Sequence, residues 1–243
     1  MKILLSPSKT KTLCGTPHRS SFHPAMTEQI VRHMQTLSIE RIANALAIAT
    51  DKATKVHDFF LHYENMPIGA AAASYSGLSF KRLNWATLDA KAQAFGEEHL
   101  VILSALYGVL EPSMPIKDYR LDLVNPILKA EKTSLYHWWR PLVADYFSGD
   151  DWILNLASKE YARLVEHPLM VTVEFQELKK EVWKQLSTSS KMMRGLLARY
   201  MLEYRVTDIQ QLPQQIGDFT LHSALPTSVT EPMTIVYRND RNR

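Results

Sequence analysis

Cysteine is nearly absent from this sequence, since Cys14 is the only one among 243 residues. One thiol excludes an intrachain disulfide, and it cannot supply the thiolates of a zinc finger or an iron–sulfur cluster. Cys14 is interpreted as a passive loop thiol, with a redox sensor as the alternative if Lys9 or Lys11 stabilises its thiolate. The low cysteine content thus excludes intrachain disulfides, zinc fingers and iron–sulfur clusters. Whether Cys14 is redox-active stays open.

Long apolar stretches and targeting patterns are also missing. The run "LVILSAL" at 100–106 is among the longest, and it is too short to cross a bilayer. Pro7 and Lys9 interrupt the start of the chain before the apolar core of a signal peptide can form. We therefore expect a cytoplasmic protein with no membrane partner.

Recognisable catalytic and metal-binding motifs are absent as well. The 8 glycines form no dinucleotide fingerprint, no Gly-x-Ser-x-Gly elbow occurs, and the 9 histidines show no ligand spacing. We therefore expect no metal site and no cofactor, and we assign no catalytic residue. Glu160 and Glu174 are capable of acid–base chemistry, but nothing in the sequence pairs them. Whether the protein is an enzyme stays open at this level.

The composition that remains is that of a globular protein with an uneven charge distribution. Hydrophobic residues make up 46% of the chain and charged residues 22%, which suits a well-buried core. The net charge is only +3, yet residues 1–34 carry 5 − 1 = +4 and residues 191–205 carry 4 − 1 = +3. Two basic segments in a nearly neutral chain indicate a local anion-binding surface, with solvated helix faces as an equally good explanation.

Hydrophobic periodicity predicts strands and helices in irregular alternation. Strands are expected at 2–6, 99–106, 151–158, 169–175, 218–225 and 233–238. Helices are expected after caps at Thr27, Ser38 and Ser134, over 50–64, over 86–95 with an end at Gly96, and over 189–206. The segment 107–123 is expected to be mostly loop, and 68–78 stays undecided between strand and tight turn.

No linker or repeat divides the chain, so a single domain over 1–243 is predicted. Its class is mixed α/β (α+β), with a mixed central sheet flanked by helices. The spacing of the expected strands does not match a doubly wound fold.

Polar residues follow three of the predicted strands at the point where each ends. The first turn contains Ser6, Lys9 and Thr10, the second Ser104, Tyr107 and Gly108, and the third Asn155, Ser158, Glu160 and Tyr161. Because ligands of α/β sheets gather beyond the carboxyl ends of strands, these turns are expected to line one cleft. Strands often end in polar residues, so each turn alone is weak support.

Two of these positions and their neighbours suggest contact with an anion. Gly108 lies between apolar residues and indicates either a positive φ or a close backbone approach to a ligand, with a plain turn as the alternative. Tyr119 and Arg120 in "DYRLDL" offer an aromatic ring and a planar cation suited to phosphate. An ion pair between Arg120 and Asp122 is the competing interpretation.

The last long helix carries a basic stripe. Lys191 and Arg194 are three residues apart and lie on one predicted face together with Ala198. Gly195 costs about 1 kcal/mol inside a helix, which indicates that something packs close to the backbone there. The stripe is interpreted as a surface for a nucleic-acid backbone, whereas Arg199 points elsewhere and is expected to be structural.

Five motifs occur in order along the chain, namely "KILLSPSKT", "LSALYGVLEP", "DYRLDL", "NLASKEY" and "RGLLARYMLEYR". In this order and with these separations they resemble the YaaA family, bacterial cytoplasmic proteins linked to peroxide stress, from Met1 to about Arg205. The resemblance implies an α/β domain of unusual topology with a positively charged cleft and a helix-hairpin-helix-like element that binds DNA. It also implies a role in limiting unincorporated iron and oxidative DNA damage.

The same motifs supply the candidate residues for binding DNA or another anion. They are Ser6, Lys9, Thr10, Tyr107, Gly108, Tyr119, Arg120, Asn155, Ser158, Tyr161, Lys191, Arg194 and Gly195, with Pro7 and Ser104 as matching neighbours. The chain departs from the family pattern at Ser8, Glu111, Asp118 and Met192. Two of these changes remove positive charge and one adds negative charge, which weakens the case for phosphate contact near them.

Three functions compete at this stage. The first is a stress protein that binds duplex or branched DNA through a basic cleft with little sequence specificity. The second is an enzyme acting on a nucleotide or nucleobase in the same cleft, with Lys9 and Arg120 on the phosphate and Tyr161 or Glu160 moving a proton. The third, direct iron binding, conflicts with the histidine spacings. We favour the first and expect Lys9, Arg120 and Arg194 to face one electropositive hollow.

Overall fold

The computed structural model describes residues 1–129 and 132–240. The described helices are α1 (Pro24–Thr36), α2 (Ile39–Leu46), α3 (Thr50–Leu61), α4 (Ala71–Ser74), α5 (Leu78–Leu83), α6 (Ala90–His99), α7 (Leu135–Phe147), α8 (Lys159–Ala162) and α9 (Ser187–Glu203). Short 3₁₀ turns occupy Tyr63–Asn65, Trp85–Thr87 and Ile209–Gln211. The strands are β1 (Lys2–Leu5), β2 (Gly69–Ala70), β3 (Leu100–Ser104), β4 (Gly108–Leu110), β5 (Pro115–Ile116), β6 (Ile153–Asn155), β7 (Met170–Lys179), β8 (Val182–Lys184), β9 (Gln215–Ile216), β10 (Phe219–Leu221) and β11 (Met233–Asn239).

Nine of the described strands form one mixed sheet in the order β4-β3-β1-β6-β7-β11-β10-β9, with β8 paired to β7. The five strands from β3 to β11 in this order are parallel to their neighbours. Antiparallel strands complete the sheet on both sides. The predicted mixed α/β class with a mixed sheet is therefore confirmed, although its centre is more regularly parallel than the strand spacing indicated.

The position of β1 creates a topological switch point. β1 pairs with β3 on one side and with β6 on the other, so the chain continues from it in both directions across the sheet. In open α/β sheets ligands bind beyond the carboxyl ends of strands at such a point. We call the side of the sheet on which β1, β3 and β6 end the carboxyl edge.

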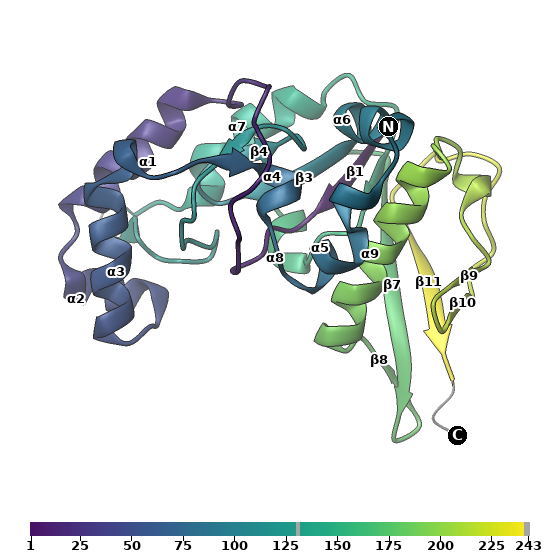
Figure 1. The fold of residues 1–243 in the computed structure, drawn as a ribbon. Helices are drawn as coiled ribbons and strands as arrows, with labels where there is room; N and C mark the ends of the chain where they lie inside the picture. The colour runs from purple at the N-terminus through teal and green to yellow at the C-terminus, as the bar shows by residue number, and fades with distance from the viewer. Residues whose placement is uncertain (130–131, 241–243) are drawn as a thin grey trace.

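The central strands are buried because both faces of the sheet are covered. All five residues of β3 and all three of β6 are buried, which is the continuous apolar pattern of parallel strands under helices. α9 packs against α5, α6 and β7, whereas α7 packs against β4 (Figure 1). The indole N–H of Trp139 on α7 donates to the Ala105 carbonyl at 3.0 Å. These contacts hold the strand ends in place.

Two groups of elements extend away from the centre of the sheet. α1, α2 and α3 pack together beside the β4 end, and the β7–β8 hairpin projects at the bottom of the view, between the centre of the sheet and its β9 end (Figure 1). α2 and α3 are joined by three residues, of which Ala47 has a positive φ of 49°. Along the described chain, no helix is both long and apolar enough to cross a membrane.

The beginning of α1 differs from its prediction. The expected cap, Thr27, lies within the helix, and its hydroxyl donates to the Leu106 carbonyl at 3.1 Å. His23 caps the helix instead, because its Nδ1 accepts the backbone N–H of Met26 at 3.2 Å and Pro24 provides a favourable first residue. Imidazole caps are hard to recognise in sequence because Ser, Thr, Asp and Asn dominate this position. The caps predicted at Ser38 and Ser134 are confirmed.

α6 also differs from its prediction. Asp89 caps it by accepting the Ala92 N–H at 2.7 Å, and the helix continues beyond Gly96 to His99. Gly96 is required by packing, since a Cβ there would lie 2.6 Å from the Trp85 ring. The expected loop at 107–123 contains β4 and β5, and β8 was not anticipated. Short strands of two or three residues carry too little periodicity to be predicted.

Candidate functional site

The first cluster at the carboxyl edge joins three chain segments that are distant in sequence. Lys9 Nζ lies 3.1 Å from Asp122 Oδ2, and the Tyr161 hydroxyl donates to Asp122 Oδ1 at 3.2 Å. Ser6 Oγ accepts the backbone N–H of Ser158 at 2.8 Å and donates to its hydroxyl at 3.1 Å. The turns after β1 and β6 and the 119–122 segment therefore meet here, as expected for carboxyl strand ends.

A layer of buried hydroxyl groups supports this cluster from below. The Tyr119 hydroxyl is 2.7 Å from Ser104 Oγ and 3.0 Å from the Tyr75 hydroxyl. Burial raises the pKa of Tyr119 to about 12, so this hydroxyl stays protonated at neutral pH. The Tyr107 hydroxyl accepts the backbone N–H of Lys117 at 3.0 Å. Tyr107 and Tyr119 are thus buried supports, and neither ring is exposed to a ligand.

Lys11 is a residue that the sequence analysis did not place in the site. Its side chain is 2% exposed, and Nζ donates to the Tyr119 carbonyl at 2.6 Å and lies 3.6 Å from Asp118 Oδ1. Burial lowers the pKa of Lys11 to about 8, although Asp118 opposes this shift. Asp118, one of the departures from the family pattern, therefore partly balances a buried ammonium.

The buried ammonium predicts an unusual pH dependence of stability. The Lys11 pKa is about 8 in the folded chain against an ordinary 10.5, so between these values the unfolded chain binds more protons. The free energy of unfolding should rise by about 2 kcal/mol between pH 8 and about pH 10, and Lys11→Met should remove that rise. Urea unfolding of both proteins across this range measures the difference. Equal slopes would contradict the burial of a charged Lys11.

The second cluster surrounds a groove of about 430 Å³ that lies beyond the end of β6 and beside the first half of β7. Its polar lining residues are Asn155, Lys159, Arg163, Thr172, Glu174, Gln185 and Arg194. Asn155 is 4% exposed, and its amide is oriented by donating to Thr172 Oγ1 at 3.1 Å and accepting the Ala157 N–H at 3.0 Å. We call this space the β6–α9 groove.

The β6–α9 groove has an excess of positive charge. Lys159, Arg163 and Arg194 face one lining carboxylate, Glu174, and none of the three cations forms a salt bridge with a described residue. Arg194 Nε is buried and has no hydrogen-bond partner in the described part of the chain. Leaving such a donor unpaired costs roughly 1–3 kcal/mol. Burial lowers the pKa of the Arg194 guanidinium, and Glu174 opposes this shift.

The predicted site residues are therefore divided between two places. Lys9 and Arg120 line a water-sized hollow of about 10 Å³, whereas Asn155 and Arg194 line the β6–α9 groove. Thr10 and Arg120 are exposed, and Asp122 pairs with Lys9 and not with Arg120. Within residues 1–129 and 132–240, no single hollow contains all of these cations, which contradicts the expectation. α8 carries Lys159 into the groove and Tyr161 into the first cluster, and so lies between the two.

Gly108 has the positive φ that was one of its two predicted explanations, Gly195 has the predicted close packing, and only the basic stripe needs correction. An added Cβ at Gly195 would lie 2.0 Å from the Ser79 carbonyl oxygen of α5, so protein and not DNA occupies this space. Gly108 has a positive φ of 70° and packs on Trp139, where a Cβ would lie 2.5 Å from the ring. Lys191 is exposed and lines neither cluster, so the predicted stripe is not one continuous face. Both glycines are structural because their backbones touch neighbouring helices.

Arg199 is structural, as expected. Its Nη1 donates to the Leu83 and Asn84 carbonyls at 3.0 and 3.1 Å and to Thr87 Oγ1 at 2.9 Å. Its Nη2 lies 2.6 Å from Glu203 Oε1. This side chain fastens α9 to the segment after α5 and holds Arg194 on the same helix in position.

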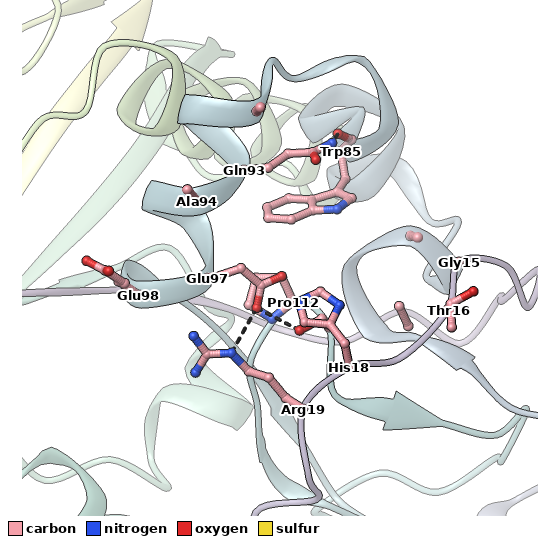
Figure 2. A pocket seen from close by; sticks show the side chains of 14 residues that line it. Gly15, Thr16, His18, Arg19, Trp85, Gln93, Ala94, Glu97, Glu98 and Pro112 are labelled. Atoms are coloured by element: carbon pink, nitrogen blue, oxygen red, sulfur yellow. Dashed lines mark hydrogen bonds and ion pairs between the residues drawn. The ribbon is translucent and has the colours of Figure 1, made fainter.

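A separate pocket of about 530 Å³ lies between α6 and the chain at 15–19, away from both clusters (Figure 2). Arg19 Nε is 3.2 Å from Glu97 Oε2, which also accepts the Ser113 hydroxyl at 2.8 Å, and Trp85 forms one wall. Glu111 pairs with Arg19 there as well. The one arginine of this pocket is thus neutralised by carboxylates, which does not suit a phosphate. Glu111, a departure from the family pattern, removes no charge from the carboxyl edge.

The remaining departures also have local roles. Ser8 Oγ accepts the Gly77 N–H at 3.1 Å, and Met192 Sδ accepts a hydrogen bond from Arg82 at 3.7 Å.

The Cys14 thiol is exposed and donates to the Ala73 carbonyl at 3.0 Å. Among the described residues no group of three or more His, Cys, Asp or Glu side chains is placed to hold a metal ion.

Known proteins are similar to this sequence along most of its length. The family described as "Peroxide stress protein YaaA" matches residues 1–223. The chain belongs to this family. It is 32% identical to the UPF0246 protein LBA1843 of Lactobacillus acidophilus, over 90% of this chain and 89% of that protein. It is 30% identical to the UPF0246 protein MADE_1015435 of Alteromonas mediterranea, over 95% and 96%. The resemblance seen in the five motifs is thus confirmed as membership of the peroxide stress protein YaaA family.

Lys159 and Arg163 were missed by the sequence analysis. Both follow the polar end of β6, in the stretch "NLASKEYAR" at 155–163. Their four-residue spacing places them on one face of α8 and its continuation, which was the available signal. The sequence interpretation considered the neighbouring Glu160 and Tyr161 instead of these two cations.

Proposed function

We propose that this protein binds DNA through the carboxyl edge of its sheet, in the cytoplasm, and that this binding limits iron-dependent DNA damage during peroxide stress. The observation that supports the proposal best is the cation excess of the β6–α9 groove, where Lys159, Arg163 and Arg194 face one carboxylate. Unneutralised cations in a concave surface concentrate positive potential and attract phosphate. Membership of a peroxide stress family supplies the cellular context.

Three further features extend the proposed surface. Lys9, which pairs with Asp122, and the exposed Arg120 lie on the other side of α8 from the groove. The pair α2–α3 is our candidate for the helix-hairpin-helix-like element. α3 begins at Thr50 after Ala49, which makes no side-chain cap, so the N–H groups of Thr50 and Asp51 are available to a phosphate, whereas that of Lys52 donates to the Ala49 carbonyl at 3.1 Å. Lys52 and Lys55 on the first turns of α3 are exposed, and their two positive charges exceed the one negative charge of Asp51. Contacts of this kind bind the DNA backbone without reading its sequence.

The proposal predicts binding that depends steeply on salt. Contact with about four phosphates gives a slope of log K against log salt near −3.6, so affinity should fall about 100-fold between 50 and 200 mM salt. Fluorescence anisotropy of labelled duplex, branched and single-stranded DNA measures this slope. Affinity should depend little on sequence. Absence of binding to all three at low salt would refute the proposal.

An enzyme acting on a nucleotide or nucleobase is a second candidate, favoured by the Lys9–Asp122–Tyr161 contacts. In this case Lys9 would bind a phosphate after release from Asp122, and Tyr161 or Glu160 would move a proton. Burial raises the pKa of Glu160, and the nearby charge of Asp122 adds to this effect. A Lys9→Ala variant that keeps DNA affinity but loses a nucleotide-dependent activity would favour the enzyme. Loss of DNA affinity in the variant, with no nucleotide-dependent activity in either protein, would favour DNA binding alone.

A further inference from the structure

We propose that the β6–α9 groove binds one nucleotide unit, with its phosphate against Arg194 and its base against the wall formed by α8 and β7. The inference rests on the proposed function where the nucleotide belongs to a DNA strand. The chemistry is the same for a free nucleoside monophosphate, so the source of the nucleotide is decided by experiment.

The shape of the groove suits a small ligand better than a continuous strand. Its volume of about 430 Å³ lies within the range of about 300–1,000 Å³ that is usual for ligand pockets. It lies beyond the end of β6, where parallel sheets bind ligands, and the first residues of β7 form one of its walls. A duplex backbone that only passes over the protein would need no such depth.

The phosphate end is defined by Arg194. Its Nε is a buried donor that lacks a partner among the described residues, and an anion that accepts this N–H would satisfy it. The planar arginine fork matches phosphate oxygens in two parallel hydrogen bonds. Arg163 is held 5.4 Å from the centre of the Tyr136 ring, which restricts its guanidinium, and Lys159 is exposed at the opening. The three cations and the one carboxylate, Glu174, give the groove a net charge that balances a dianionic phosphate group.

The base end combines apolar surface with fixed hydrogen-bonding groups. Ala157, Ala162 and Met170 provide apolar lining. The Asn155 amide is held by Thr172, and this contact uses one of its two N–H donors. A base has apolar faces and polar edges, so it requires this combination of surfaces. Inorganic phosphate would leave the apolar lining and the amide unused.

Isothermal titration with the four deoxynucleoside monophosphates tests the groove directly. We expect binding at least about 10-fold tighter than that of inorganic phosphate, because the base adds contacts. Arg194→Met, which keeps the apolar stem, should weaken nucleotide binding by at least about 10-fold, and Arg194→Lys should weaken it less. Arg205→Gln is the matched control, since Arg205 is exposed beyond the opposite end of α9 and should have no effect. Thermal unfolding of each variant confirms that it is folded.

A 2-aminopurine base in single-stranded and duplex DNA distinguishes the two sources. Increased fluorescence on binding, reversed by added nucleoside monophosphate, would show that the groove takes a nucleotide from a strand. Nucleotide binding without this signal would assign the groove to the free nucleotide. If DNA binds but neither probe responds, or if inorganic phosphate binds as tightly as the nucleotides, this inference is overturned and the proposed function stands. If nucleotides bind and DNA does not, the proposed function fails and the groove assignment stands.

Discussion

A triple variant, Lys159→Gln/Arg163→Gln/Arg194→Gln, is expected to lose measurable DNA binding at physiological salt. Each phosphate contact contributes about 0.9 to the slope of log K against log salt, so the slope should become shallower by nearly 3. Affinity at low salt should fall by about 100-fold or more, since the groove would retain Glu174 and no cation. Anisotropy titrations over a series of salt concentrations measure both quantities.

The single variant Arg205→Gln is the control for this loss. Arg205 contributes to the same basic segment of the sequence but lies just beyond the C-terminal end of α9, on the exposed surface. Its removal should leave the salt slope within about 1 of the wild-type value. If the triple variant is folded and binds DNA as the wild type does, the groove is not the DNA site. If Arg205→Gln lowers binding as strongly, the effect is one of net charge and not of position.

Gly195→Ala is expected to produce the largest loss of stability. The added Cβ would lie 2.0 Å from the Ser79 carbonyl oxygen and 2.7 Å from its carbon, and both belong to backbone. Backbone cannot rotate away as a flexible side chain does, so α5 and α9 must separate. Overpacking of this kind costs about 3 kcal/mol or more, despite the better helix propensity of alanine. Urea and thermal unfolding followed by circular dichroism measure the change.

Gly149→Ala provides a matched glycine substitution. No described atom lies within 4 Å of the position that its Cβ would take, and its φ is not positive. We expect its free energy of unfolding to stay within about 0.5 kcal/mol of the wild type. A Gly195→Ala protein as stable as Gly149→Ala would show that α5 and α9 are not packed backbone to backbone. Because Arg194 is adjacent to Gly195, a destabilised variant should also bind DNA more weakly.

The strands that could be predicted are those with continuous apolar runs. β1 and β3 are such runs, and central parallel strands buried on both faces require this pattern. The caps at Ser38 and Ser134 were equally readable because a hydroxyl before an apolar helix is a local signal. His23 and Asp89 also cap helices, but competing residues nearby, such as Thr27, concealed their boundaries.

The candidate site was only partly predictable. The polar turns after β1 and β6 could be located because each follows directly from a strand. The role of each cation could not, because it depends on distant partners. Lys9 is neutralised by Asp122, whereas Lys159 and Arg163 are not paired with any described carboxylate. Burial of Lys11 depends on rings and carbonyls contributed by the 118–122 segment.

The amino-acid sequence by itself determined the α/β class, the strand-end turns and the family, because these depend on local periodicity and on the order of motifs. Only the tertiary structure decided which cations remain unneutralised and which glycines touch protein. Gly195 packs on Ser79 and Lys9 pairs with Asp122 because folding brings separate segments within contact distance. Charge pairing and close packing act over a few ångströms in space, and separation along the chain carries no information about them.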